Sequence, residues 1–214
     1  MKRRPRKHIC WCGTAPSVRM ACEAALDPEH VRVCHFAEPS VCLETLLATP
    51  CDVLIVDLAE SEAAGLHLLA QVQQRAPWIS TLAIVPPGAV GVAVRALKVG
   101  VCECLEQPVR ADRLSAEVQG LLARTASLPR SHRTLTEMEV HIVRSILAGK
   151  TSQDIATELR RSKRTIDVHR KNIMRKLRAD NLADLVRRAL AMGLGKEPRY
   201  EDAVRDDGVR PDAS

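Results

Sequence analysis

The sequence has no uninterrupted apolar run of about eighteen residues, which is the length that a membrane-spanning helix requires. Its basic start, MKRRPRK, is also not followed by the apolar segment of a secretory signal peptide. We therefore expect a cytoplasmic protein that makes no contact with a membrane. The length of 214 residues suggests two domains.

Cysteine is absent after residue 104, and none of the eight cysteines has the CxxC spacing that is typical of zinc ribbons and thiol oxidoreductases. We therefore predict no zinc ribbon, no cofactor and no disulfide framework. The pairs Cys10/Cys12 and Cys102/Cys104 are spaced by two on predicted strands, so each pair is expected to share one buried face. We interpret the cysteines mainly as small apolar core residues. A thiol redox switch or a metal site is the alternative, with Cys102 and Cys104 as the redox candidates.

Short apolar runs alternate with helical patterns through the first half of the chain. The predicted strands are HICWC, VRVCHF, DVLIVDL, TLAIV and CECL, and the predicted helices are residues 18–26, 41–48, 65–75, 90–98 and 112–123. Five strands that alternate with five helices predict an α/β fold with a doubly wound, five-stranded parallel sheet. Sites in such sheets lie at the carboxyl ends of the strands, and Asp57 stands at the end of the third strand.

The second half contains four signals for the start of a helix. Thr136 and Glu139 have the capping-box spacing, and Gly149 is suited to end that first helix. Three further starts are expected at Thr151, Ser162 and Asn181. Two short helices, a tight turn and a longer third helix that ends near residue 177 predict a helix-turn-helix within an all-α, four-helix domain.

The predicted third helix has two different sides. At roughly 100° per residue, its packing side carries Ile166, Ile173 and Leu177. The opposite side and its edges carry Arg164, Asp167, Val168, Lys171, Asn172 and Arg175. Arginine and lysine read guanine, asparagine reads adenine, aspartate accepts from cytosine, and valine contacts the thymine methyl group. The amino end of the helix also favours a phosphate.

Positive charge is concentrated in one part of the chain. Residues 126–196 contain sixteen basic and seven acidic side chains, a net charge of +9, whereas residues 1–125 contain thirteen of each kind. Residues 197–214 have a net charge of −3. A neutral domain joined to a strongly basic one predicts an anionic partner, double-stranded DNA, for the second half. The alternative is a solvated, charged helix face, and the basic residues 1–7 suit either an arm on the DNA backbone or a solvated tail.

The segment LTEMEVHIVRSILAGKTSQDIATELRRSKRTIDVHRKNIMRKLRADNLADLVRRALAMG resembles the LuxR-type helix-turn-helix of NarL/FixJ response regulators. It fits the frames LTxxE, AGKxSxxIAxxL and SxRT(V/I)xxHxxNIMxKL. The resemblance implies that DNA is contacted by Arg164, Thr165, Asp167, Val168, Lys171 and Arg175. Asp167 departs from family members that are basic there, so it either reads a base or pairs with a neighbouring cation. The resemblance also implies a homodimer through the last helix, residues 181–192.

The first half resembles the receiver domain of the same family, which has a flavodoxin-like fold. Asp57 matches the phosphoacceptor, and AVRALKVGVCECLEQP matches the fourth helix and fifth strand. Other functional positions of a receiver are replaced. Gly13 and Thr14 stand at the positions of the acidic pair, and Val85 stands at that of the hydroxyl residue. Gln107 replaces the lysine, and Cys104 replaces the switch aromatic. Mg²⁺ prefers hard oxygen ligands, and phosphoryl transfer depends on charge neutralisation, so we interpret this half as a degenerate receiver in which Asp57 is inactive.

The resulting prediction is a DNA-binding transcription regulator of the response-regulator type that is not an enzyme. Its parts are a basic arm (1–7), a receiver-like domain (8–124), a linker (125–133), a helix-turn-helix domain (134–195) and a disordered acidic tail (196–214). A histidine kinase and RNA polymerase are further candidate partners. The alternative function is a receiver-like decoy that forms heterodimers with other regulators or a kinase. A thiol oxidoreductase is disfavoured because no CxxC stands at a helix start.

Overall fold

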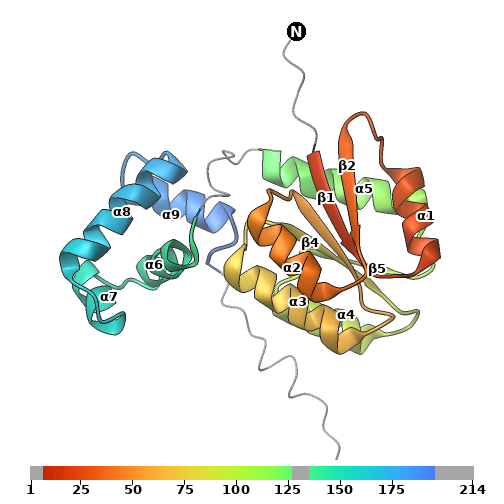
Figure 1. Ribbon diagram of the computed structural model, residues 1–214, viewed down its shortest axis with the longest axis horizontal. Coiled ribbons are helices and arrows are strands. Elements are labelled where there is room, and N and C mark those ends of the chain that lie inside the picture. Colours follow the sequence, from red (N-terminus) through yellow and green to blue (C-terminus); the bar gives the residue numbers. More distant parts are fainter. Residues whose placement is uncertain (1–6, 127–134, 196–214) are drawn as a thin grey trace, which may run out of the picture. The chain divides into compact units, whose positions relative to one another are not determined.

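The computed structural model describes residues 7–126 and 135–195, which divide into an α/β unit and a helical unit (Figure 1). The predicted arm, linker and tail lie almost entirely outside these residues. Two boundaries differ from the prediction, because the first strand already begins at Lys7 and the helix before the linker runs to Ala126. Within the described ranges, no helix combines the length and the apolar character needed to cross a membrane.

The α/β unit is built on the predicted parallel sheet of five strands. The strands are β1 (Lys7–Cys12), β2 (Val31–Phe36), β3 (Val53–Asp57), β4 (Ser80–Val85) and β5 (Glu103–Glu106). Their order is β2-β1-β3-β4-β5, so β2 and β5 form the edges of the sheet. The inner strands β3 and β4 are buried along their whole length, whereas β2 is half-exposed. Because all pairs are parallel, the carboxyl ends of the strands meet at one edge, where Asp57 lies.

Each strand is followed by a helix. The helices are α1 (Pro16–Ala25), α2 (Pro39–Ala48), α3 (Glu62–Arg75), α4 (Val90–Val99) and α5 (Ala111–Ala126). The first three begin two or three residues earlier than the periodicity predicts. In α1 and α2 the missed signal is a proline in the first turn, where its fixed φ suits the helix and its missing N–H would have no partner in the helix.

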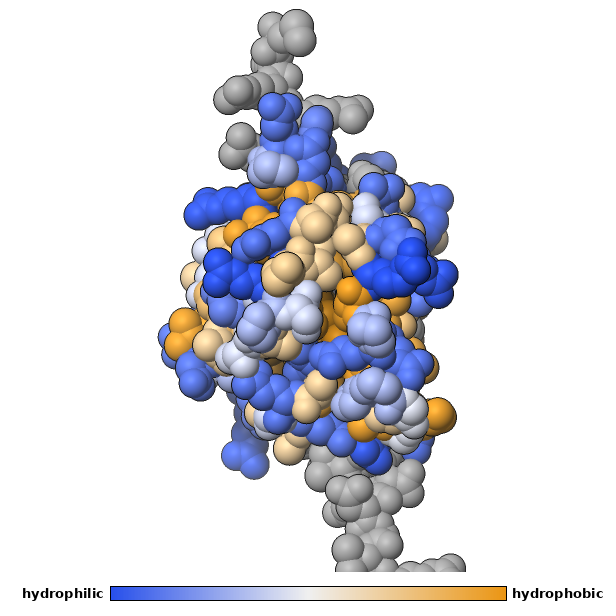
Figure 2. Space-filling view, turned by 90° about the vertical axis from the view of Figure 1, so that its right-hand side faces the viewer, coloured by the Kyte–Doolittle hydropathy of each residue, from blue (hydrophilic) through white to orange (hydrophobic). Residues whose placement is uncertain are grey.

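Helices cover both faces of the sheet, which is the doubly wound arrangement (Figure 1). On one face, Val18 of α1 and Leu114 and Leu121 of α5 pack in a cluster with Ile9 and Trp11 of β1. The helices α2, α3 and α4 cover the opposite face. On the side of the molecule that carries α1, the surface is mainly hydrophilic with smaller apolar patches between (Figure 2). This unit therefore buries both faces of its sheet and leaves the strand edges and loops for function.

The cysteines all belong to the α/β unit and are free thiols. Five are core residues, as predicted, namely Cys10, Cys12, Cys22, Cys42 and Cys51. The prediction that Cys102 and Cys104 form a buried pair on a strand is wrong, because β5 begins at Glu103 and both thiols are only half-buried. The physical reason is that β5 is a short edge strand, which a neighbouring strand covers on one side only. Cys34, which is also half-buried, lies on the other edge strand, β2.

The helical unit consists of α6 (Glu137–Leu147), α7 (Ser152–Glu158), α8 (Lys163–Leu177) and α9 (Leu182–Ala191). All four predicted helix starts are confirmed. Thr136 and Thr151 each form a complete capping box, in which two backbone N–H groups gain partners. Ser162 and Asn181 cap the other two helices by accepting a backbone hydrogen bond on their side chains. The helix-turn-helix is formed by α7, the turn and α8.

The helical unit has an apolar core of its own, to which all four helices contribute. The buried carboxylate of Glu139 joins two of the helices around this core. The carboxylate of Glu139 accepts hydrogen bonds from the backbone N–H of Thr136 at 2.8 Å and from the ammonium group of Lys176 at 2.7 Å. The start of α6 is therefore joined to the last turn of α8, and the position of α8 is fixed at that end.

Candidate functional site

The two sides of α8 differ as the sequence predicts. Ile166, Ile173 and Leu177 are fully buried in the core of the helical unit. The opposite side is exposed and carries Arg164, Val168, Lys171 and Arg175, while Thr165, Asp167 and Asn172 are half-exposed. Because the buried side anchors the helix to α6 and α7, the exposed side presents its cations in a fixed arrangement.

The amino end of α8 has an unusual charge. The first turns of α6, α7 and α9 carry acidic residues, which suit the partial positive charge of a helix start. The first turn of α8 has no acidic residue and carries Lys163 and Arg164 instead. Two cations at a helix start repel the helix dipole, and this repulsion is relieved when an anion binds there. The start of α8 therefore favours a phosphate group.

Several side chains of α8 already have partners. Arg175 donates to the amide oxygen of Asn172 at 3.3 Å, and Arg170 donates to the hydroxyl of Ser152 on α7 at 2.7 Å. The hydroxyl of Thr165 lies 2.8 Å from that of the capping Ser162. Within residues 7–126 and 135–195, no ion pair joins Asp167 to a neighbouring cation. Thus Arg170 stabilises the helix-turn-helix, while Arg175 and Asn172 form a hydrogen-bonded pair on the exposed side.

The last helix, α9, has an apolar stripe that the core does not cover. Leu182 and Leu190 are 51% and 56% exposed, and Val186 between them is half-buried. These three residues are spaced by four and therefore lie on one side of the helix. Leu185 and Met192 point into the core instead, so only part of the predicted dimer segment is accessible.

The phosphoacceptor position, Asp57, is buried at the carboxyl edge of the sheet. Its Oδ1 accepts a hydrogen bond from the backbone N–H of Ala59 at 2.9 Å, and the amide of Gln107 lies 3.4 Å from both carboxylate oxygens. Burial raises the pKa of Asp57 above its ordinary value. The hydrogen bond from the N–H of Ala59 lowers this pKa, and the negative charge of Glu60 raises it. Both of these donors to the carboxylate of Asp57 are neutral groups.

Gly13 and Thr14, which the resemblance to a receiver places at the positions of the acidic pair, have different surroundings. A Cβ atom at Gly13 would lie 2.8 Å from the Cβ of Asp57 and 3.2 Å from Nε1 of Trp11. Thr14 donates from its backbone N–H to Glu60 at 3.1 Å, and its hydroxyl donates to the same carboxylate. Glu60, whose direction the sequence leaves open, therefore faces Thr14. A larger side chain at position 13 requires the backbone to move.

The switch positions of a receiver are also filled by other side chains. Val85, at the end of β4, is buried and has no hydroxyl group. Cys104, on β5, lies with its sulfur 4.0 Å from the carbonyl oxygen of Ala93 in α4. Burial raises the pKa of the Cys104 thiol, and the carboxylate of Glu103 raises it further. A raised pKa keeps this thiol protonated, which lowers its reactivity.

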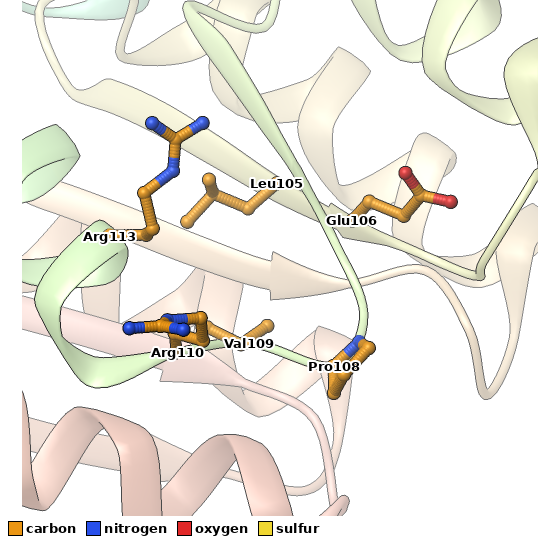
Figure 3. A pocket seen from close by; sticks show the side chains of 6 residues that line it. All are labelled: Leu105, Glu106, Pro108, Val109, Arg110 and Arg113. Atoms are coloured by element: carbon orange, nitrogen blue, oxygen red, sulfur yellow. The ribbon is translucent and has the colours of Figure 1, made fainter.

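A small hollow lies where β5 leads into α5, next to Gln107. Its volume is about 200 Å³, and it is lined by Leu105, Glu106, Pro108, Val109, Arg110 and Arg113 (Figure 3). The side chain of Glu106 points away from those of the two arginines. Arg110 pairs with Asp112 at 3.0 Å, so the positive charge beside the hollow is partly neutralised.

Residues 9–119, more than half of the chain, match the family model of the response regulator receiver domain. The chain belongs to the response regulator family. Residues 133–189 of this response regulator match the bacterial regulatory proteins of the luxR family. It is therefore a DNA-binding transcription factor of the two-component type and not an enzyme.

Known regulators resemble both halves of this response regulator. The transcriptional regulatory protein FixJ of Rhizobium meliloti is 33% identical over 153 residues, which cover 67% of this chain and 75% of FixJ. The response regulator protein TodT of Pseudomonas putida is 29% identical over 162 residues, or 71% of each chain. The crystal structure of full-length FixJ from B. japonicum covers 90% of the regulator with a TM-score of 0.50 and 26% identity.

Proposed function

We propose that this response regulator binds DNA sequence-specifically with the exposed side of α8 in the major groove. The observation that supports this most directly is the arrangement of α8, whose apolar side is buried while Arg164, Lys171 and Arg175 are exposed. The proposed contacts are Arg164, Thr165, Asp167, Val168, Lys171 and Arg175. Cations on this side suit guanine and phosphate, the exposed Val168 suits a thymine methyl group, and Asp167 suits cytosine.

Residues 134–193 alone are expected to bind DNA, because this segment contains α6 to α9 and every buried residue of their apolar core except Leu194. The measurement is footprinting of the full chain and of this fragment at low micromolar concentration, on DNA fragments obtained by selection. Protection of the same short sequence by both proteins supports the proposal. If neither protein protects a specific sequence, the decoy function gains support.

We further propose that α9 forms the contact of a homodimer. In the apolar stripe formed by Leu182, Val186 and Leu190, the described residues leave both leucines exposed and Val186 half-buried. In a dimer with a two-fold axis, two copies of this stripe pack against each other. Each leucine of the stripe is then buried in both protomers. Each fully buried leucine contributes about 1.5–3 kcal/mol, which is enough to support association.

Leu182→Ser and Leu190→Ser together are expected to weaken the dimer by about tenfold or more, because both side chains lose their apolar cover. Since both residues are exposed in the protomer, its thermal stability should change little. Sedimentation equilibrium measures the association, and Met20→Ser, at an exposed apolar position of α1, is the matched control. Equal association of the double variant and the control would refute the α9 contact.

We also propose that Asp57 does not take part in the usual Mg²⁺-dependent phosphorylation. Mg²⁺ needs several hard oxygen ligands, but Gly13 offers no carboxylate and Thr14 is engaged with Glu60. At position 107 an amide stands where the receiver family has a lysine, so the charge that develops in phosphoryl transfer lacks that cation. The residues present therefore do not fit the ion. Asp57 serves instead as a buried polar cap at the end of β3.

Without phosphorylation, DNA affinity is either constitutive or dependent on the oxidation state of thiols. We propose that it is constitutive, so that oxidation of Cys102 and Cys104 does not change it. The raised pKa of Cys104 supports this choice. Cys104→Ser is expected to bind DNA as the unchanged protein does, both under strong reductant and after mild peroxide. The comparison uses binding isotherms together with mass by light scattering. A difference between the two proteins that appears only after peroxide would establish redox control at this strand.

A further inference from the structure

A cysteine and a histidine form a pair at the edge of the sheet, away from Asp57. The Nε2 atom of His8 on β1 lies 3.2 Å from the sulfur of Cys34 on β2. The other ring nitrogen, Nδ1, lies 2.7 Å from the carbonyl oxygen of Pro50. Both side chains are half-exposed because β2 is an edge strand. The pair is therefore open to small molecules from solvent.

The contact with Pro50 sets the tautomer of the imidazole of His8. A carbonyl oxygen only accepts hydrogen bonds, so Nδ1 of His8 must carry a proton and donate it. In the neutral ring, Nε2 then has a lone pair directed at the thiol of Cys34 and is able to take its proton. A nucleophile, a base and a group that orients the base are the three parts of an activated nucleophile.

A second thiol lies beside this pair. Cys10 is the register partner of Cys34 on the neighbouring parallel strand. Adjacent strands are about 4.8 Å apart, which is within the separation of Cα atoms that a disulfide bridges. A hydrogen bond with Cys51 lowers the pKa of the Cys10 thiol; burial opposes this effect, and the charge of Arg32 supports it. Cys10 is therefore suited to react with an oxidised sulfur on Cys34.

We propose that Cys34 is a reactive thiol that takes up two-electron oxidants of the hydroperoxide class, with His8 as its base and Cys10 as the resolving thiol. This site differs from the redox candidates Cys102 and Cys104, which lie at the opposite edge of the sheet. It also does not depend on the proposed mode of DNA binding, because it belongs entirely to the α/β unit.

The chemistry has two balanced steps. In the first, His8 takes the thiol proton and the sulfur of Cys34 attacks the peroxide, so an S–O bond forms while the O–O bond breaks. The sulfur loses two electrons to the peroxide, and the leaving oxygen takes the proton from His8 as water or an alcohol. In the second step, the sulfur of Cys10 attacks that of Cys34. The S–S bond forms, the S–O bond breaks, and the hydroxide leaves with the Cys10 proton as water.

The first test measures the reactivity of each cysteine in the reduced full-length protein. A brief pulse of iodoacetamide, followed by unfolding and labelling of the remaining thiols with a heavy isotope, gives the rate for each site by mass spectrometry. Cys34 is expected to react about tenfold faster or more than Cys104, which is also half-buried but has no imidazole partner. In His8→Leu, with folding checked by thermal unfolding, the rate at Cys34 should fall to that at Cys104. Equal rates in the unchanged protein would overturn the proposal.

The second test uses one equivalent of hydrogen peroxide. The unchanged protein is expected to lose two hydrogen atoms and to yield a peptide in which Cys10 and Cys34 are joined. Cys10→Ser should instead accumulate a sulfenic acid on Cys34 that dimedone traps, and Cys34→Ser should give neither product. A disulfide between two cysteines other than Cys34 would overturn the proposal that Cys34 is the reactive thiol. A persistent dimedone adduct on Cys34 in the unchanged protein would overturn the role of Cys10.

Discussion

Replacing Lys171 and Arg175 together by alanine is expected to weaken DNA binding by about 30-fold or more, because each cationic contact contributes roughly 1–3 kcal/mol. Both side chains are exposed on the side of α8 opposite the core, so their loss should leave the fold of the helical unit unchanged. The measurement is a gel shift with the full chain at a stated salt concentration, supported by thermal unfolding of both proteins.

The same experiment shows what each side chain contacts. If Lys171 binds a phosphate, Lys171→Ala weakens binding to all sequences alike and lowers the salt dependence by about one unit. If it reads guanine, the loss is confined to one base position. Arg113→Ala on α5 removes one positive charge from an exposed position of the α/β unit and serves as the control. Unchanged binding by the double variant would show that α8 does not present this side to the groove.

Asp57 is expected to remain unmodified when the protein is incubated with Mg²⁺ and a small phosphodonor. The groups around its carboxylate do not neutralise the charge of a phosphoryl group. Gln107 contributes a neutral amide, and the carboxylate of Glu60 accepts a hydrogen bond from Thr14. Intact mass is the measurement, and a regulator with a complete acidic pair is the positive control. The gain of one phosphoryl group that Asp57→Asn abolishes would restore the ordinary phosphorylation mechanism.

Restoring one acidic residue should not rescue phosphorylation. In Gly13→Asp, the new Cβ would lie 2.8 Å from the Cβ of Asp57, so the backbone has to move before a carboxylate fits. The close approach of position 13 to Asp57 is therefore a second obstacle, in addition to the proposed lack of ligands for Mg²⁺. This variant separates the two causes, since rescue by Gly13→Asp alone would show that the missing carboxylate is the only obstacle.

The helical unit is the part that the sequence predicts best. Caps such as Thr136 and Ser162 act within three residues, and the packing side of α8 follows directly from helical periodicity. The backbone at Arg160 and Arg178 is different, because both adopt positive φ angles of 50° and 53° that favour glycine. Each of them closes a helix, because the N–H of the next residue bonds back to the carbonyl of Ala156 or Met174. No local signal predicts an arginine at either position.

The site in the α/β unit is only partly predictable. The position of Asp57 follows from the strand pattern, because a carboxylate after an apolar run ends a parallel strand. The contact between Glu60 and Thr14, and that between His8 and Cys34, join residues far apart in the sequence, so their discovery requires the strand order and register. The exposure of Cys104 depends on the edge position of β5, which the pattern of apolar runs does not reveal.

We propose that this response regulator binds its operator through α8 without phosphorylation of Asp57. The most direct test is the binding isotherm of the full-length protein on an operator found by selection, with and without Mg²⁺ and the phosphodonor. The unchanged protein and Asp57→Asn are expected to have affinities within about twofold of each other under both conditions. A rise in affinity of tenfold or more that requires the phosphodonor and disappears in Asp57→Asn would contradict it.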